Sequence, residues 1–261
     1  MRSIWSGAIS FGLINIPVKL YTAVRDTRPD FDLLHKKDLS PIRYARVCKA
    51  EGEEVSFKDL VKGYEYQKGD YVVLQDEDFK KANVRKTQTI DILDFVDAAQ
   101  IDLKFLDKPY YLEPTRDSKK AYALLCEGLK KTGKVGIANY VLRTREHLCA
   151  VRPEGNLLVL YQMRYYEEIV QPADLDVPGS SEATKKELDI AVKLIDQLTA
   201  DFKPEQYRDT YTEELMRVIR EKAEGKVPKA AGEAPVPTEV PDLMSKLRQS
   251  LEHAKKKRTA A

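Results

Sequence analysis

Residues 5–24 read WSGAISFGLINIPVKLYTAV, two short runs rich in β-branched and aromatic residues that Gly12 and Pro17 interrupt. Such runs, bounded by turn residues, are typical of β-strands, and we expect strands over residues 8–13 and 18–24. Similar runs follow before residue 170, and the further strands expected are 42–48, 71–75, 89–96, 110–112, 135–143, 147–151 and 157–165. Many strands and one clear helix, residues 118–131, favour a barrel or sandwich of the α+β class over repeated βαβ units.

The hydrophobic period changes after residue 180. Ser180 or Ser181 is expected to cap a helix whose apolar stripe extends from Leu188 to Phe202. Pro204 should end this helix, because proline cannot continue it. A second helix is expected from about Thr210 to Gly225.

The remaining residues change composition once more. Residues 227–241 contain four prolines and cannot bury a core, so they are expected to form a semi-extended linker. Asp242 can cap a last short helix with a narrow leucine stripe, after which the chain becomes basic. We therefore predict four parts: a core over 1–175, a helical arm over 176–226, a linker over 227–241, and a short helix with a basic tail over 242–261.

Charge is segregated along the chain although it nearly cancels. The 261 residues are 43% hydrophobic and 33% charged, with a net charge of +2. Residues 108–152 hold ten Lys and Arg against four Asp and Glu, whereas residues 167–225 hold eight against fifteen. A phosphate backbone would be attracted to the first segment and repelled by the second. Solvated faces of an ordinary soluble protein would give the same pattern.

Cysteine usage and hydropathy indicate a soluble cytoplasmic protein. Cys48, Cys126 and Cys149 are too few and too widely spaced for a disulfide framework. The apolar stretch over residues 4–16 is interrupted by small polar residues, so it is a poor signal peptide and too short to span a bilayer. No membrane association is expected.

Catalytic motifs are incomplete. The segment from Gly128 to Val135 has P-loop spacing, but valine replaces the hydroxyl that would hold Mg²⁺, and the segment follows a helix instead of a strand. We interpret Gly133 as the end of that helix. The histidines lack the spacing of zinc ligands. Asp94 and Asp97 could in principle hold Mg²⁺ in a nuclease, but they should lie on opposite faces of a strand and so not converge on one ion. The sequence thus favours a binding protein with no catalytic residue, metal or cofactor.

A set of motifs carries a resemblance to a known family. The matching segments, in chain order, are residues 5–13, 15, 17–21, 42–44, 47–48, 62–65, 109–112, 114, 120–122, 124–125, 143–148 and 152–153. Over roughly residues 1–220 the chain resembles the bacterial Ku proteins. One departure is clear: many relatives have a C-x-x-C pair where this chain has Cys48-Lys49-Ala50-Glu51, so a zinc or redox role of that turn is in doubt. We expect Cys48 to be a small buried side chain.

The resemblance implies a fold and a function. It implies a predominantly β-barrel core with an inserted DNA-encircling bridge at about residues 25–66, a helical C-terminal arm and a flexible basic tail. Two copies would form a homodimeric ring on the end of double-stranded DNA. The family acts in nonhomologous end joining and recruits an ATP-dependent DNA ligase that carries polymerase activity. Such a protein would be cytoplasmic and associated with the nucleoid.

An end-binding protein must hold any sequence, so its contacts should go to phosphates through Lys and Arg. The residues expected to bind DNA are Arg28, Lys36, Lys37, Arg43, Arg46, Arg143, Arg145, Arg152, Lys255, Lys256, Lys257 and Arg258. Arg143 and Arg145 are expected at alternate positions of one strand, and hence on one face. Two other functions stay open at this point: a DNA-binding regulator, for which no helix-turn-helix pattern is evident, and a metal-dependent nuclease.

Overall fold

The computed structural model of the chain describes residues 1–82, 88–172, 175–179, 184–227 and 245–252. The chain divides into two compact units, Met1–Gln171 and Pro172–Ala261.

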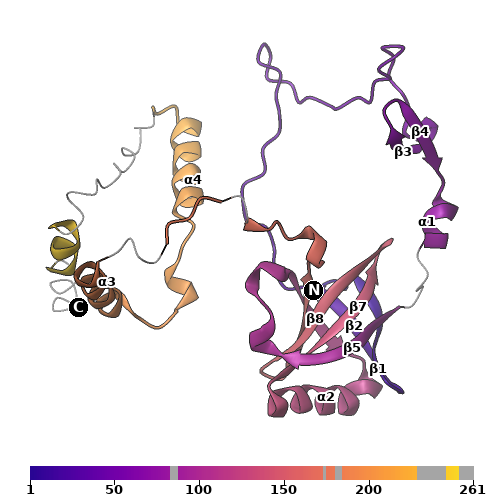
Figure 1. Cartoon of the computed structure of the whole chain (residues 1–261). Coiled ribbons are helices and arrows are strands. Elements are labelled where there is room, and N and C mark those ends of the chain that lie inside the picture. Colours follow the sequence, from indigo (N-terminus) through magenta and orange to yellow (C-terminus); the bar gives the residue numbers. More distant parts are fainter. Residues whose placement is uncertain (83–87, 173–174, 180–183, 228–244, 253–261) are drawn as a thin grey trace. The chain divides into compact units, whose positions relative to one another are not determined.

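The first unit contains a closed seven-stranded barrel (Figure 1). Its strands are β1 (Trp5–Phe11), β2 (Ile14–Thr22), β5 (Thr89–Asp97), β6 (Leu106–Pro114), β7 (Lys134–Leu142), β8 (Arg145–Glu154) and β9 (Leu157–Met163). Their order is β1-β2-β6-β9-β8-β7-β5, and the parallel pairing of β1 with β5 closes the barrel. The expected β-barrel core is confirmed.

The opening stretch forms a hairpin earlier in the sequence than expected. β1 starts at Trp5 because Trp5 pairs with Leu20, and it ends at Phe11 because Gly12, with φ of 58°, turns the chain. In β2, Ile16, Val18 and Leu20 alternate with exposed residues and are almost fully buried. This alternation directs one face of each strand into the barrel, where these side chains exclude water.

The helix α2 (Lys119–Thr132) packs across one end of the barrel. Leu125, Cys126 and Leu129 belong to the barrel's core cluster. The Tyr122 hydroxyl donates to the Leu112 carbonyl at 2.7 Å and accepts from the Leu158 amide at 2.5 Å. One buried side chain therefore ties α2 to β6 and to β9. Burial raises the pKa of Tyr122 to about 12, so the hydroxyl keeps its proton.

The end of α2 settles the P-loop question. Gly133 has φ of 65°, and its amide donates to the Leu129 and Lys130 carbonyls, so this N–H is not available to donate to a phosphate. Gly133 thus ends the helix as expected, and the chain enters β7 directly.

Between β2 and β5 the chain leaves the barrel in a long excursion, residues 23–88. It contains β3 (Lys62–Gln67) and β4 (Asp70–Leu74), which form an antiparallel hairpin, and α1 (Asp76–Ala82) (Figure 1). The strand expected over 42–48 is wrong: this stretch makes only an isolated bridge, Val47 with Glu54, because no strand lies beside it. Among the described side chains of the excursion, none is buried.

The second unit contains α3 (Lys185–Leu198) and α4 (Thr210–Ala223), and residues 245–252 are also helical. Thr184 caps α3 in a capping box with Glu187; the caps expected at Ser180 or Ser181 lie outside the described residues. α3 ends at Leu198, before the expected Phe202, whose ring stacks on Tyr207. α4 begins and ends close to the expected residues, with Gly225 at φ of 76°. Most of the expected linker and the basic tail lie outside the described residues.

None of the helices in the described part of the chain is long and apolar enough to cross a membrane.

The tie through Tyr122 gives a stability prediction. Tyr122→Phe leaves the Leu112 carbonyl and the Leu158 amide without their buried partner, so it should lower the free energy of unfolding by about 1–3 kcal/mol in urea denaturation. Tyr166→Phe is the matched control, because Tyr166 is exposed, and it should have no effect. Equal stability of the two variants would contradict this role of the Tyr122 hydroxyl.

Candidate nucleic-acid interface

Strand directions divide the barrel into two ends. Trp5 pairs with Leu20 and Ala8 with Thr89, so the start of β1, the end of β2 and the start of β5 share one end. β7 is antiparallel to β5, and Leu142 pairs with Arg145, so the β7–β8 turn lies at this same end. We call this end the arginine rim, formed by Thr22, Thr89, Leu142 and Arg145. The excursion therefore starts and finishes at the rim that also holds Arg143 and Arg145.

The β7–β8 turn consists of two residues, Arg143 and Thr144. Arg143 has φ of 63°, a left-handed conformation that favours glycine and costs about 1–2 kcal/mol for a residue with a Cβ. The expected placement of Arg143 and Arg145 on one strand face is wrong, because Arg143 lies in the turn and Arg145 is the first residue of β8. The turn nevertheless presents both guanidiniums to solvent at the arginine rim.

A small polar cavity of about 230 Å³ lies beside Arg145. Its lining includes His147, Glu168 and Asp107, and the Arg145 Nη2 lies 3.8 Å from a Glu168 carboxylate oxygen. Partial burial, and then the positive charge of Arg145, lower the pKa of His147 below its ordinary value. His147 is therefore neutral at pH 7 and adds no charge to the rim.

Arg164 also lines this cavity, and sequence reasoning missed it. Its Nη1 donates to the Leu106 carbonyl at 2.5 Å and to the Lys104 carbonyl at 3.1 Å. The partners are about sixty residues away along the chain, so no local pattern could have revealed this contact. Arg164 thereby connects the start of β6 to the end of β9 at the arginine rim.

The cations expected in the excursion have different partners. Arg28 is bonded to Asp26, with Nη2 and Oδ2 2.5 Å apart, and Arg43 to Glu54 at 3.0 Å. The Arg46 guanidinium lies 5.2 Å from the centre of the Phe57 ring. Arg28 and Arg43 would have to exchange a carboxylate for a phosphate.

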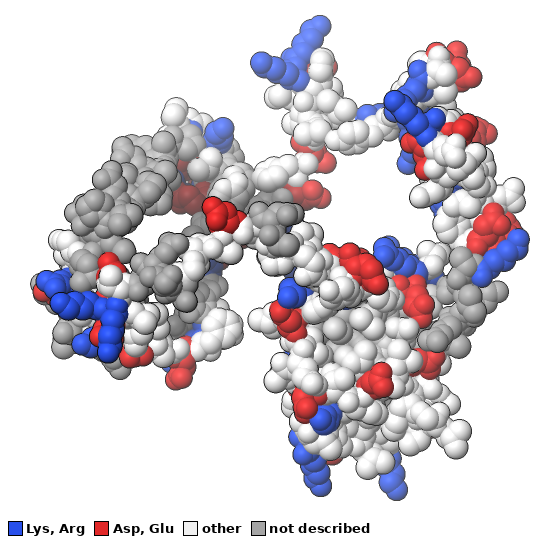
Figure 2. Space-filling model, in the orientation of Figure 1, with Lys and Arg blue, Asp and Glu red and all other residues white. Residues whose placement is uncertain are grey.

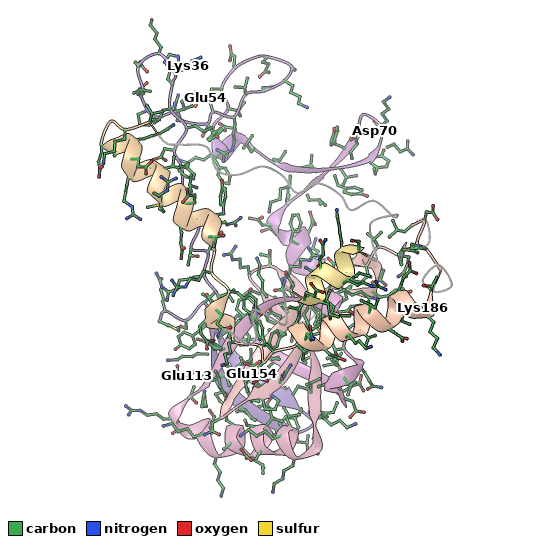
Figure 3. The ribbon with its side chains drawn as sticks, turned by 90° about the vertical axis from the view of Figure 1, so that its left-hand side faces the viewer. Lys36, Glu54, Asp70, Glu113, Glu154 and Lys186 are labelled. Carbon is green, nitrogen blue, oxygen red and sulfur yellow. The ribbon has the colours of Figure 1, made fainter. Side chains whose placement is uncertain are left out.

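Lys36 and Lys37 differ, because they occupy an exposed turn and have no ion pair among the described residues. Lys36 points outward from its loop (Figure 3). Figure 2 shows Lys and Arg side chains gathered at several outer points of the excursion, interspersed with acids.

The other expected cations do not join the arginine rim. Arg152 pairs with Val159 near the opposite end of β8 and borders a cavity with Lys130 and Gly133, beside α2. Lys255, Lys256, Lys257 and Arg258 lie outside the described residues. The structure thus brings together Arg143 and Arg145, and separates Arg152 from them.

Metal and thiol chemistry gain no support from the geometry. Cys48 is half-buried, not buried as expected, because its turn is exposed in the excursion; its amide donates to the Glu53 carbonyl at 2.9 Å. Asp97, one of the acids considered for a nuclease, is bonded to Lys134 at 2.7 Å. In the part of the chain that is described, no group of three or more His, Cys, Asp or Glu side chains could hold a metal ion.

Comparison with known proteins agrees with this architecture. Residues 10–190 match the Ku70/Ku80 beta-barrel domain. The chain belongs to the Ku family. It is 48% identical to the non-homologous end joining protein Ku of Opitutus terrae, covering 96% of this chain and 91% of that protein. Identity is 44% with the protein of the same name from Cupriavidus necator (96% and 77% covered) and 40% with that of Bacillus subtilis (98% and 83%).

The arginine rim of this Ku family member gives a prediction for DNA binding. Arg143→Ala with Arg145→Ala should reduce the slope of log affinity against log salt concentration by about two units, since each phosphate contact contributes about one. The measurement is fluorescence anisotropy with a labelled duplex over a range of salt. The charge-matched control is Lys119→Ala with Lys120→Ala on α2, at the other end of the barrel, which should leave the slope unchanged.

Arg143→Gly separates binding from folding. Glycine relieves the left-handed strain at this turn, so stability should stay equal or rise by up to about 1 kcal/mol while DNA affinity falls. Unchanged affinity in both Arg143 variants would show that this side chain does not contact DNA.

Proposed function

We propose that this chain is a non-catalytic DNA-end-binding protein that acts as a homodimer in double-strand break repair by nonhomologous end joining. The observation that carries the proposal is the strained basic turn at the arginine rim, from which a long exposed excursion also departs. A closed barrel with a basic rim supplies a rigid support for a phosphate backbone, and the excursion supplies a segment long enough to pass around a duplex. The end-joining role rests on the similarity to the non-homologous end joining proteins Ku of other bacteria.

Binding is proposed to be independent of sequence. Arg143, Lys36 and Lys37 are exposed cations with room to contact phosphate and sugar, which carry no base identity, and Arg145 is exposed beside Glu168, whose carboxylate it would exchange for a phosphate. Arg28, Arg43 and Arg46 would add contacts after exchanging their present partners. Arg152 and the four tail cations remain proposed as secondary contacts.

Homodimerisation is supported by the excursion's exposed apolar surface. Tyr44 is 84% exposed, Phe57 and Val61 are 73% exposed, and Tyr64 is 65% exposed. Aromatic and aliphatic side chains in this number, on a segment in which no described side chain is buried, are typical of a surface that a partner covers. We propose that the partner is a second copy of the same excursion, because in a twofold-symmetric dimer one interface covers the apolar surface of both chains.

The remaining partner follows from the family resemblance. We propose that the complex recruits an ATP-dependent DNA ligase with polymerase activity, and that the chain acts in the cytoplasm on nucleoid DNA. The chain itself would supply binding and alignment of the ends, and the ligase would supply the chemistry.

A competition experiment tests end binding. A labelled linear duplex bound to the protein is challenged with equal masses of unlabelled linear DNA or closed circular DNA of the same sequence. Linear DNA should displace the label at a concentration at least tenfold lower, whatever its sequence. Equal competition by circles would refute end binding; preference for one sequence would indicate a regulator, and shortening of the duplex with Mg²⁺ a nuclease.

Light scattering tests the dimer. The purified chain should have twice its 29.8 kDa mass at micromolar concentration. Tyr64→Asp places a charge in the proposed interface and should weaken association at least tenfold. Leu103→Asp is the matched control, because Leu103 is 81% exposed and lies outside the excursion. A wild-type mass of one chain would contradict the dimer.

A further inference from the structure

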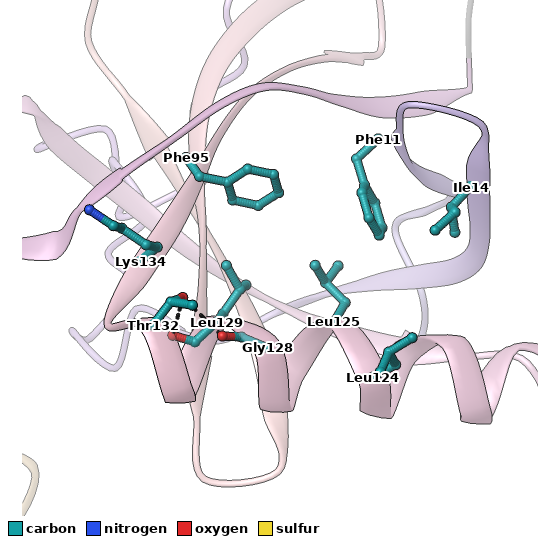
Figure 4. Close-up of a pocket in the computed structure, with 9 residues that line it drawn as sticks. All are labelled: Phe11, Ile14, Phe95, Leu124, Leu125, Gly128, Leu129, Thr132 and Lys134. Atoms are coloured by element: carbon teal, nitrogen blue, oxygen red, sulfur yellow. Dashed lines mark hydrogen bonds between the residues drawn. The ribbon is translucent and has the colours of Figure 1, made fainter.

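An apolar groove lies between α2 and the barrel end opposite the arginine rim. It encloses about 460 Å³ and is lined by the β1–β2 hairpin, β5 and α2. Figure 4 shows Phe11 and Phe95 on one side, facing Leu124, Leu125 and Gly128 of α2 across the hollow. The rings of Phe11 and Phe95 meet edge to face, with centroids 6.3 Å apart.

The surface of the groove is almost entirely apolar and exposes almost no hydrogen-bonding groups. Its polar side chains are engaged elsewhere: the Thr132 hydroxyl bonds the Gly128 carbonyl at 2.9 Å, and the Lys134 ammonium bonds Asp97 at 2.7 Å. Leu124 is nevertheless 70% exposed, Phe95 is 46% exposed and Ile14 is 42% exposed. These side chains form one continuous apolar surface that the barrel's own core does not cover.

Gly128 is unexpected within α2. Glycine destabilises the middle of a helix, and neither a left-handed φ nor a packing contact requires it here, because a Cβ built at Gly128 meets no atom within 4 Å. What the glycine does provide is depth, since it lowers the floor of the groove beside Leu124. Gly128 thus destabilises α2 and deepens the groove, which indicates that the groove binds a partner.

The rim of the groove along α2 is basic. Lys120 lies one turn before Leu124 and Lys131 one turn after Gly128, on the same side of the helix. Glu127, the acid between them, is bonded to Lys130 at 2.6 Å, which leaves Lys120 and Lys131 without an ion pair among the described residues. Figure 2 shows positive side chains projecting at this end of the barrel.

We propose that this groove docks an amphipathic helix of another protein, with large apolar side chains on one face and Asp or Glu beside them. The barrel is closed, so no strand edge is free to pair with an extended peptide. A helix satisfies its own backbone and presents only side chains, which suits a carbon-lined groove. The site lies at the end of the barrel remote from Arg143 and Arg145, so a partner can bind there while DNA occupies the arginine rim.

Among the helices in the described part of the chain, α1 has an acidic surplus but only seven residues, too few to span the groove, and the longer helices lack such a surplus. α3 and α4 each carry three acidic and three basic residues, so neither has an acidic surplus. Residues 245–252 carry Lys246 and Arg248 against one acid, Glu252, so this segment has a net positive charge that the lysines of the groove rim would repel. Charge complementarity therefore favours a helix from a different protein.

Peptide binding to the full chain tests the proposal. The probe is a fluorescein-labelled helical peptide of about 18 residues with Leu at i, i+4, i+7 and i+11 and Glu at the flanking positions, followed by anisotropy. It should bind at least tenfold more tightly than the same peptide with Lys in place of Glu, and than the version with Ala in place of Leu. Equal affinity for the Glu and Lys peptides would overturn the proposal.

Substitutions at Gly128 locate the site without harm to folding. Gly128→Leu fills the groove and should weaken binding of the Glu peptide at least tenfold, whereas Gly128→Ala should change it by less than about threefold. Both variants should melt about 2–4 °C higher, because both residues favour the helix more than glycine does. Both should retain wild-type DNA affinity.

Two further outcomes would refute the proposal. Unchanged peptide binding by Gly128→Leu would place the peptide elsewhere. Displacement of the Glu peptide by an unlabelled peptide of residues 185–198, at equal or lower concentration, would assign the groove to α3 of this chain.

Discussion

The parallel pairing of β1 with β5 is the constraint on which the rest of the first unit depends. These two strands are separated by the whole excursion in sequence, yet their backbone hydrogen bonds close the sheet and remove its edges. Closure fixes the direction of every strand, and the strand directions decide which turns share an end. Arg143, Arg145 and both ends of the excursion are assembled at one end for this reason, and α2 with the β1–β2 turn at the other.

Closure also explains how a chain of almost zero net charge can attract DNA. The electrostatic potential that a phosphate meets is set by nearby side chains, and the sum over the molecule matters little beyond a Debye length. Arg143 keeps a bulky cation at a backbone conformation that favours glycine, and Arg145 follows two residues later at the same rim. These two arginines can therefore act locally although the whole chain has a net charge of only +2.

The excursion, unlike the barrel, is not stabilised by a buried core in its described part. A segment of this length whose described side chains are all at least partly exposed gains little from the hydrophobic effect, yet Tyr44, Phe57 and Tyr64 expose large apolar surfaces. Its own contacts are local: the β3–β4 hairpin, the Val47–Glu54 bridge, and the pairs of Arg43 with Glu54 and Arg46 with Phe57. Such contacts stabilise only short turns of the excursion. The proposed dimer would cover its exposed apolar side chains, and association and DNA binding would then depend on the same segment.

The sequence by itself determined the elements whose signal is local. Runs of β-branched and aromatic residues predicted β5, β7 and β9 to within two residues at each end and the middle part of β8, and the helical pattern followed by Gly133 predicted α2, because these signals come from residues close in sequence. The motifs in order along the chain also identified the family. The tertiary structure alone decided what depends on distant pairing: residues 42–48 have strand-like composition but no neighbouring strand, whereas β3, with a weaker signal, has β4 beside it. The same holds for the site, since charge marked Arg143, Arg145 and Arg152 alike, and only strand direction separates Arg152 from the other two and sets Gly128 opposite Phe95.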